Sequence, residues 1–188
     1  MIPPAHVLVY LFADRVTDPR AGEGPARSEM QVPCSEERRS ATDVATTALA
    51  SIFWSLRDRR LIALEVKKTV RGEDVIDIAG PHDAQLFGLE GRLLDCASEN
   101  ELTPAIANWF GVAVPDPYEH FLAAVRHEAA DYGYLDESNF EPLCAQIAEL
   151  DDRAADLAAR WRTFHQQEAD LCSLLLASCG RGLEACAA

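Results

Sequence analysis

Lysine is almost absent from this sequence: among 188 residues, 15 of the 17 basic residues are arginine, and only Lys67 and Lys68 are lysine. This bias, together with abundant alanine, is typical of proteins from GC-rich bacterial genomes. Positive charge is also in the minority: 17 basic residues against 31 acidic ones give a net charge of −14. The electrostatic field of a protein with this net charge repels polyanions, which disfavours a general surface that binds nucleic acid or anionic lipid. The 48% hydrophobic content excludes a wholly disordered chain.

Long hydrophobic runs are also missing. The longest, residues 7–13 and 174–177, fall far short of the ~20 residues of a membrane-spanning helix. The first residues lack the positive charge of a secretory leader, so we expect a cytoplasmic protein with no transmembrane segment. Six cysteines occur without any C-x-x-C pair, which disfavours a zinc site and predicts reduced, mostly buried thiols.

Catalytic motifs are absent too. The sequence contains no G-x-S-x-G, H-E-x-x-H, Walker loop or G-x-G-x-x-G. His120 and His127 are seven residues apart on one expected helix, which is two turns or roughly 10 Å, too far to share one ion unaided. A solvated polar face is the favoured interpretation of these histidines. We therefore expect no catalytic residues, no metal and no cofactor.

Residues 1–80 predict a winged-helix-like unit. Residues 5–15 form a short apolar element, either strand or helix, and residues 17–39 lack a period and predict a loop. A helix then begins at Ser40 or Thr42, with a residue spacing close to a capping box. One buried stripe is expected on it, formed by Val44, Ala48, Leu49, Ile52, Phe53 and Leu56. Two β-branched runs around the turn at 71–74 predict a β-hairpin, the wing.

Residues 81–138 predict a second winged-helix-like unit of three helices and a strand. The first helix is expected over 83–97, and the second is capped by Thr103 and closed by Gly111. The third begins at the N-cap Asp116 and carries its apolar residues inward before it ends at Gly133. A short strand is expected to follow.

Residues 139–188 predict one long amphipathic helix with a frayed end. Apolar residues recur at spacings of three, four and seven, and only Glu168 interrupts them. About 35 residues would make a rod about 50 Å long, which must lie along the body or pair with another helix, as in a coiled coil. We expect Gly180 and Gly182 to end it. The predicted helix interface comprises Leu150, Leu157, Trp161, Phe164 and Leu171.

A cluster of cations follows the first long helix and continues onto the predicted wing. Its members are Arg57, Arg59, Arg60, Lys67, Lys68 and Arg71. Winged helices contact DNA phosphates with this part of the fold. Four acidic residues dilute the cluster, so residues 57–74 carry a net charge of only +2. DNA, anionic lipid, an acidic partner protein, the acidic tail of the same chain and ordinary surface charge all remain open as its counterparts.

Two resemblances extend this interpretation. The segment TALASIFWSLRDRRLIALEV, residues 47–66, resembles the helix-then-wing segment of many bacterial winged-helix proteins. The wider order over residues 5–136, ending in DYGYL, is similar in layout to bacterial relatives of the Golgi phosphoprotein lipid-binding family. That family holds a phosphoinositide headgroup with an aromatic residue and several arginines. No position here matches those residues, so the resemblance implies a fold and no site.

We therefore expect a mostly helical α+β protein with a winged-helix-like body, a hairpin wing and a long C-terminal helix. The leading functional hypothesis is a non-enzymatic cytoplasmic interaction or scaffold protein that assembles with itself or another chain through the tail helix. The alternatives are a dimeric winged-helix DNA-binding regulator and a peripheral protein that binds anionic lipid through the basic cluster.

Overall fold

The computed structural model describes residues 3–17, 28–80, 86–96 and 101–188. Within those ranges, helices predominate and two antiparallel hairpins supply the strands, which confirms the predicted mostly helical α+β class. The helices are α1 (Ala5–Leu11), α2 (Ala13–Val16), α3 (Ala41–Asp58), α4 (Gly88–Cys96), α5 (Leu102–Phe110), α6 (Pro117–Asp131), α7 (Cys144–Ala148), α8 (Asp151–Gln167) and α9 (Ala169–Glu184). The strands are β1 (Glu29–Gln31), β2 (Arg38–Ser40), β3 (Ala63–Lys68) and β4 (Asp74–Ala79).

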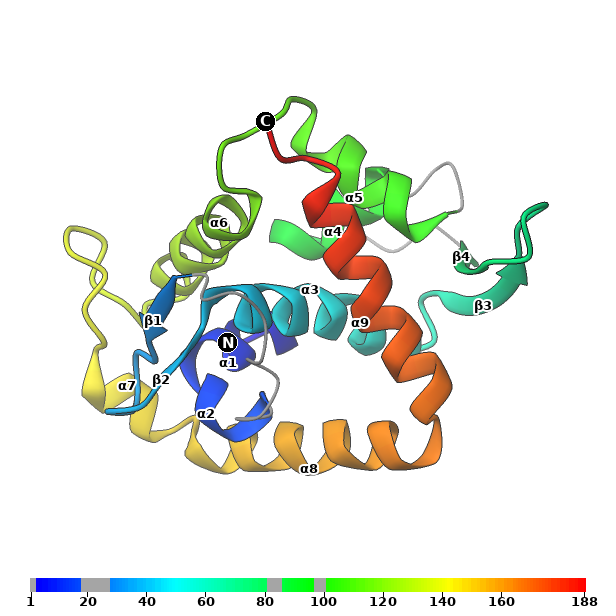
Figure 1. Ribbon diagram of the computed structural model, residues 1–188. Coiled ribbons are helices and arrows are strands. Elements are labelled where there is room, and N and C mark those ends of the chain that lie inside the picture. The colour runs from blue at the N-terminus through cyan, green and yellow to red at the C-terminus, as the bar shows by residue number, and fades with distance from the viewer. Residues whose placement is uncertain (1–2, 18–27, 81–85, 97–100) are drawn as a thin grey trace.

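Helix α3 runs through the middle of the molecule, between α1, α6 and α9 (Figure 1). The Ser40 hydroxyl accepts a hydrogen bond from the Asp43 amide, as expected of an N-cap. Small residues outside the predicted stripe, including Ala45, Ala50 and Ser51, are also buried. Because neighbouring helices surround α3, it buries more than the single stripe that the sequence predicts.

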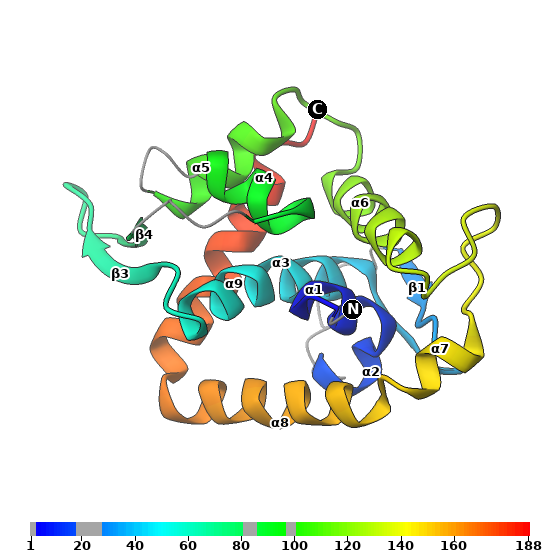
Figure 2. The same cartoon turned by 180° about the vertical axis from the view of Figure 1, so that it is seen from behind.

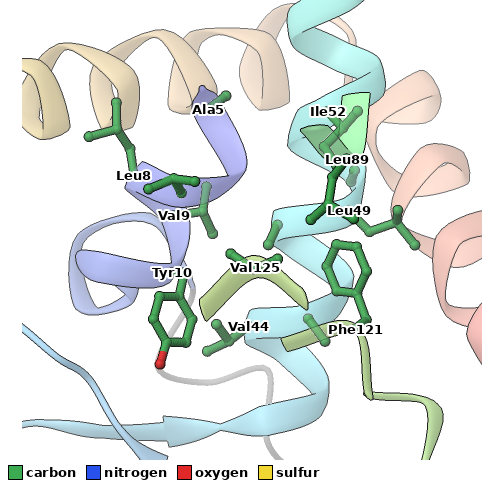
Figure 3. Packing of buried hydrophobic residues seen from close by; sticks show 14 of the residues in the cluster. Ala5, Leu8, Val9, Tyr10, Val44, Leu49, Ile52, Leu89, Phe121 and Val125 are labelled. Carbon is green, nitrogen blue, oxygen red and sulfur yellow. The ribbon is translucent and has the colours of Figure 1, made fainter. Parts of the chain in front are cut away.

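The first apolar segment is a helix, the alternative that the sequence left open. All seven residues of α1 are buried, between α3, α6 and α8. Figure 3 shows Val9 and Tyr10 of this helix in the same cluster as Val44 and Val125. A helix satisfies its own backbone groups at such a site, whereas a strand would need a neighbour that the described residues do not provide.

The two hairpins differ in how well the sequence predicts them. β3 pairs with β4, with Val66 opposite Ile76, which confirms the expected hairpin. β1 pairs with β2, with Met30 opposite Arg39. The prediction of a loop over residues 17–39 is therefore wrong at 29–31 and 38–39, which form strands, while residues 32–37 connect them and residues 18–27 lie outside the described part of the chain. Three-residue strands are too short to show a period.

The helices of residues 86–138 follow the predicted order. The Asp116 carboxylate accepts a hydrogen bond from the Glu119 amide at the start of α6, and Gly111 ends α5 at a left-handed φ of 69°, both as expected. Thr103 does not cap α5, because the helix begins at Leu102 and Glu101 occupies the N-cap position. The Thr103 hydroxyl instead lies 3.4 Å from the Ser178 carbonyl of α9. The expected strand is reduced to a single bridge between Leu135 and Pro142. Residues 83–85 and 97 of the helix expected over 83–97 lie outside the described ranges.

The tail is helical, but the expectation of one continuous rod is wrong. It consists of α7, α8 and α9, and the last two are separated at Glu168, whose φ of −130° and ψ of 49° are not helical. Both views show α9 turning sharply away from α8 (Figures 1 and 2). This turn lets α8 cover α1 and α2, while α9 packs against α3 and α5. Two shorter helices bury their apolar residues on a small body, which a straight rod could not do.

The end of the tail also differs from expectation. Gly180 and Gly182 lie inside α9 rather than at its end. A Cβ atom on Gly182 would lie 2.7 Å from Cβ of Ile106, so glycine permits the close approach of α9 to α5. The last residues do not fray, because the Val114 amide donates to the Cys186 carbonyl and the Ala188 amide donates to the Val114 carbonyl.

One hydrophobic core joins the three predicted segments 1–80, 81–138 and 139–188. Phe53 of α3, Phe121 of α6 and Leu175 of α9 are among its fully buried side chains. In the described ranges, no helix combines the length and the apolar character needed to cross a bilayer.

Candidate functional site

The predicted helix interface is formed within the chain. Leu150, Leu157, Trp161 and Phe164 are 4–6% exposed, and Leu171 is half-buried, all against the common core. The sequence allowed contact either within the chain or between chains. Because the folded chain itself covers this stripe, the stripe is not a free surface for a partner.

An aromatic cluster fixes α8 against α3. The Trp161 and Trp54 rings meet edge to face, with centroids 5.5 Å apart. Phe164 lies 6.2 Å from Trp54, and the Arg160 guanidinium lies over the Trp54 ring. Aromatic pairs in this geometry stabilise a contact beyond the area that they bury. The cluster therefore anchors the tail to the body.

Four of the six cations of the basic cluster have carboxylate partners. Arg57 contacts Glu168 with both terminal nitrogens, at 2.9 and 2.7 Å, and its guanidinium also lies over the Phe164 ring. Arg59 pairs with Glu90 at the start of α4. On the hairpin, Lys67 pairs with Asp77 and Lys68 with Asp74. Each pair neutralises a charge that a phosphate would otherwise attract.

The other two cations have no carboxylate partner among the described residues. Arg60 follows the end of α3 at a φ of 61°, a left-handed conformation that is uncommon outside glycine, and it is exposed. Arg71 is exposed in the turn between β3 and β4. Within the described ranges, Arg60 after α3 and Arg71 in the hairpin turn are thus the members of the basic cluster that no carboxylate neutralises.

The hairpin of β3 and β4 projects from the helical body in both views (Figures 1 and 2). β4 is connected to the body, since Ile76 and Ile78 are buried and Asp77 forms a bridge with Glu101. The other edge of β3 pairs with no described residue. Val66 on this strand is 52% exposed. The hairpin therefore presents an open strand edge with an apolar side chain at its centre.

A buried ionisable pair lies where α1, α4 and α6 meet. His6 is fully buried, and its Nε2 lies 3.3 Å from Oε2 of Glu128, without the alignment of a hydrogen bond. The same oxygen accepts from the Leu89 amide at 2.9 Å. Burial acts to raise the pKa of Glu128, but His6 and the Leu89 amide outweigh it and leave the pKa below its ordinary value. A Cβ atom on Gly88 would collide with this carboxylate, so glycine makes room for it.

Among the residues that the structure describes, the histidine and cysteine side chains do not converge on a metal site. His120 and His127 are both exposed on α6, and each lies against an aromatic ring, Phe110 and Phe140 respectively. No group of three metal-ligating side chains occurs within the described ranges. Cys172 and Cys179 are buried thiols; burial raises the pKa of Cys172 to about 11 and that of Cys179 further, so neither is a ready thiolate.

Sequence reasoning missed the buried carboxylates. Glu90 and Glu128 are 6% and 7% exposed, although glutamate rarely lies inside a protein. Gly88 makes room for the Glu128 carboxylate, and Glu90 lies between Gly88 and Gly91 in the sequence. Their partners, Arg59 and His6, are far away in the sequence, so no spacing could have revealed them.

Comparison with known proteins finds no match among family models, curated proteins or solved structures. The winged-helix and Golgi phosphoprotein resemblances therefore stay predictions.

Proposed function

We propose that this protein is a non-enzymatic interaction protein of the cytoplasm that assembles with a second copy of itself through the open edge of β3. The observation that carries the proposal is the unpaired edge of a projecting hairpin with exposed Val66 at its centre. Such edges are templates for pairing with another strand unless the protein blocks them. The tail, which the sequence favoured for assembly, is occupied by the chain's own core.

Charge complementarity favours a second copy as the occupant. If two β3 strands pair antiparallel about a two-fold axis at Val66, Val66 of each copy faces its equivalent. The same register places Glu65 opposite Lys67 of the second copy, and Lys67 opposite its Glu65. Lys67 also contacts Asp77 of its own chain, but its ammonium has three N–H donors and is partly exposed, so it can contact both carboxylates. Opposite charges directly across two strands stabilise their pairing. The result is a continuous four-stranded sheet, with the two β4 strands outside.

The size of this contact indicates a concentration-dependent dimer. β3 has six residues, and a pairing of this length buries less than the roughly 1,200 Å² of a stable interface. The dimer is therefore expected to form and dissociate as the protein concentration changes, which suits an assembly that responds to local enrichment.

Sedimentation velocity across a range of concentrations tests the proposal. We expect the full chain to move from the 20.6 kDa monomer towards twice that mass as its concentration rises. Val66→Lys should abolish the shift, because it opposes two cations at the axis. Val70→Lys is the matched control: Val70 is exposed in the turn, outside the strand edge, and its substitution should leave association unchanged.

A charge exchange makes the test specific to the register. Glu65→Lys and Lys67→Glu should each weaken association, because each opposes like charges across the axis. The two together should restore it. A chain that stays monomeric at about 100 µM, a concentration that reveals even weak contacts, would overturn the proposal. So would a double variant no better than either single one.

The two alternatives depend on cations that the structure largely neutralises. A DNA-binding regulator that used all six would lose affinity with salt at a log–log slope near −5, since each phosphate contact contributes about −0.9. A lipid-binding protein would sediment with vesicles containing phosphatidylserine and not with neutral ones. Either result would move the function to the basic cluster and away from the strand edge.

A further inference from the structure

The two lysines of the sequence are neighbours on β3, and both are exposed. The Lys67 side chain is 55% exposed and that of Lys68 is 72% exposed. All other basic residues are arginine, whose guanidinium stays protonated in proteins and therefore does not act as a nucleophile. The projecting hairpin thus holds every lysine amine of the sequence, on the strand whose open edge is proposed for assembly (Figure 1).

A single ammonium group compensates two carboxylates on this hairpin. Glu65 of β3 and Asp77 of β4 lie directly opposite each other in the strand register. Like charges in this position destabilise a strand pair. Lys67 Nζ donates a hydrogen bond to Asp77 and lies 4.0 Å from Oε2 of Glu65, so it neutralises both. In the antiparallel register proposed above, the same ammonium also faces Glu65 of the second copy.

The charge of Lys68 has no comparable role. Its ammonium lies 3.0 Å from Asp74, at the end of the strand pair that is nearer the turn. The proposed register places Lys68 opposite Leu64 of the second copy, so the loss of its charge leaves the ion contacts around the two-fold axis unchanged. The two amines are adjacent and chemically alike, but only that of Lys67 compensates carboxylates at the axis.

We propose that the amines of β3 are an acylation site and that acylation of Lys67 disperses the assembly, an inference that rests on the strand-edge pairing. The amine nitrogen attacks the carbonyl carbon of an acyl phosphate. An N–C bond forms, and the C–O bond breaks so that phosphate leaves with the electron pair. Asp77 is placed to accept the first of the two protons that the ammonium loses, and the departing phosphate takes the second.

The product is a neutral amide, which no longer neutralises a carboxylate. It leaves the Glu65 and Asp77 carboxylates of both copies around the two-fold axis without an ammonium group between them. Repulsion among these carboxylates opposes the pairing of the two β3 strands. Arginine at position 67 would provide the same ion contacts but could not be acylated. Lysine at this position therefore makes the assembly sensitive to acyl donors.

Acetyl phosphate and a matched pair of variants test the proposal on the full chain. In Lys68→Arg the one side-chain amine is that of Lys67, and in Lys67→Arg it is that of Lys68. The N-terminal amine reacts alike in both. Because the hydrogen bond to Asp77 raises the pKa of Lys67, incubation continues until peptide mass spectrometry shows that most of the remaining lysine is acetylated. Sedimentation velocity then compares each variant with its own untreated form.

Acetylated Lys68→Arg should associate at least about tenfold more weakly than its untreated form, because each copy loses an ion contact across the axis. Acetylated Lys67→Arg should associate as its untreated form does. Equal association of Lys68→Arg before and after treatment, equal losses in the two variants, or a Lys67 that stays unmodified while Lys68 reacts would overturn the acylation site alone. A Lys68→Arg chain that is monomeric before treatment would instead overturn the assembly on which the site depends. Circular dichroism verifies that the acetylated chains remain folded.

Discussion

The tail helices α8 and α9 and the β3–β4 hairpin both attach to the body by one apolar face, yet they use their remaining surface differently. The tail inserts Trp161 and Phe164 into the core and adds two ion pairs to the end of α3, Arg57 with Glu168 and Arg160 with Asp58. The hairpin buries only the isoleucines of β4 and projects β3 into solvent. Both regions have an amphipathic sequence, but the body covers the apolar face of the tail, whereas the hairpin keeps one strand edge open.

The largest difference between the two regions should appear when an apolar side chain is removed from each. Trp161→Ala should lower the free energy of unfolding by about 3–5 kcal/mol, because it leaves a cavity beside Trp54 and Phe164. Val66→Thr, at a half-exposed position of β3, should change it by less than about 0.5 kcal/mol. Urea denaturation followed by circular dichroism measures both. Similar losses in the two variants would show that the tail and the hairpin contribute alike to stability.

A smaller effect should come from the contact of α9 with α5. Gly182→Ala should destabilise the fold by about 1–3 kcal/mol, because the new methyl group collides with Ile106. Gly180→Ala is the matched control two residues away on the same helix, where a Cβ atom meets nothing within 4 Å. There alanine should stabilise the protein by about 0.5–1 kcal/mol, through its higher helix propensity. Thermal unfolding of the pair should thus give shifts of opposite sign.

The ion pairs should contribute less to the free energy of unfolding than the contact of α9 with α5 does. Arg57→Ala removes the contact that both terminal nitrogens make with Glu168. Because the Arg57 side chain is about one-third exposed, the substitution should lower the free energy of unfolding by only about 1 kcal/mol. The cost should shrink in high salt, because salt screens partly exposed charges. Arg71→Ala in the hairpin turn should have no measurable cost. Unfolding at low and high NaCl concentration tests this contrast; a salt-independent cost at Arg57 would assign its effect to packing on Phe164.

The pH dependence of stability should depend on a buried contact that neither region contains. The pKa of Glu128 is lower in the folded chain than its ordinary value of 4.5, so the unfolded chain binds the proton more readily. This contribution is fully present above pH 4.5 and is lost as the pH falls through the folded pKa. Glu128→Gln should therefore unfold with a shallower acid dependence than the parent. Glu141→Gln, at an exposed position, should keep the parent profile in the same urea titrations.

Local chemistry made much of the fold predictable. Ser40 and Asp116 cap helices where the sequence indicates, Gly111 ends α5, and the β-branched runs of β3 and β4 pair. These features depend on residues within a few positions of one another. The turn between α8 and α9 was not predictable from the apolar spacing, because it accompanies contacts with distant segments: Glu168 meets Arg57, 111 residues earlier, and the two helices pack on different parts of the body.

The candidate sites were harder to predict for the same reason. Counting cations located the basic cluster in the sequence, but four of its members contact carboxylates, and two of those carboxylates, Glu90 and Glu168, come from distant parts of the chain. Glu90, the partner of Arg59, lies on the helix expected over 83–97, where nothing in the sequence marks a carboxylate for burial.

The sequence by itself determined the mostly helical class, the start of α3 and α6, the end of α5, the β3–β4 hairpin, which residues are apolar enough to be buried, and the excess of negative charge. Only the tertiary structure decided that the tail folds back on its own body, that most of the basic cluster is paired, and that β3 keeps an open edge. The physical reason is range: capping and periodicity act over a few residues, whereas ion pairing, helix packing and burial depend on which distant segments meet.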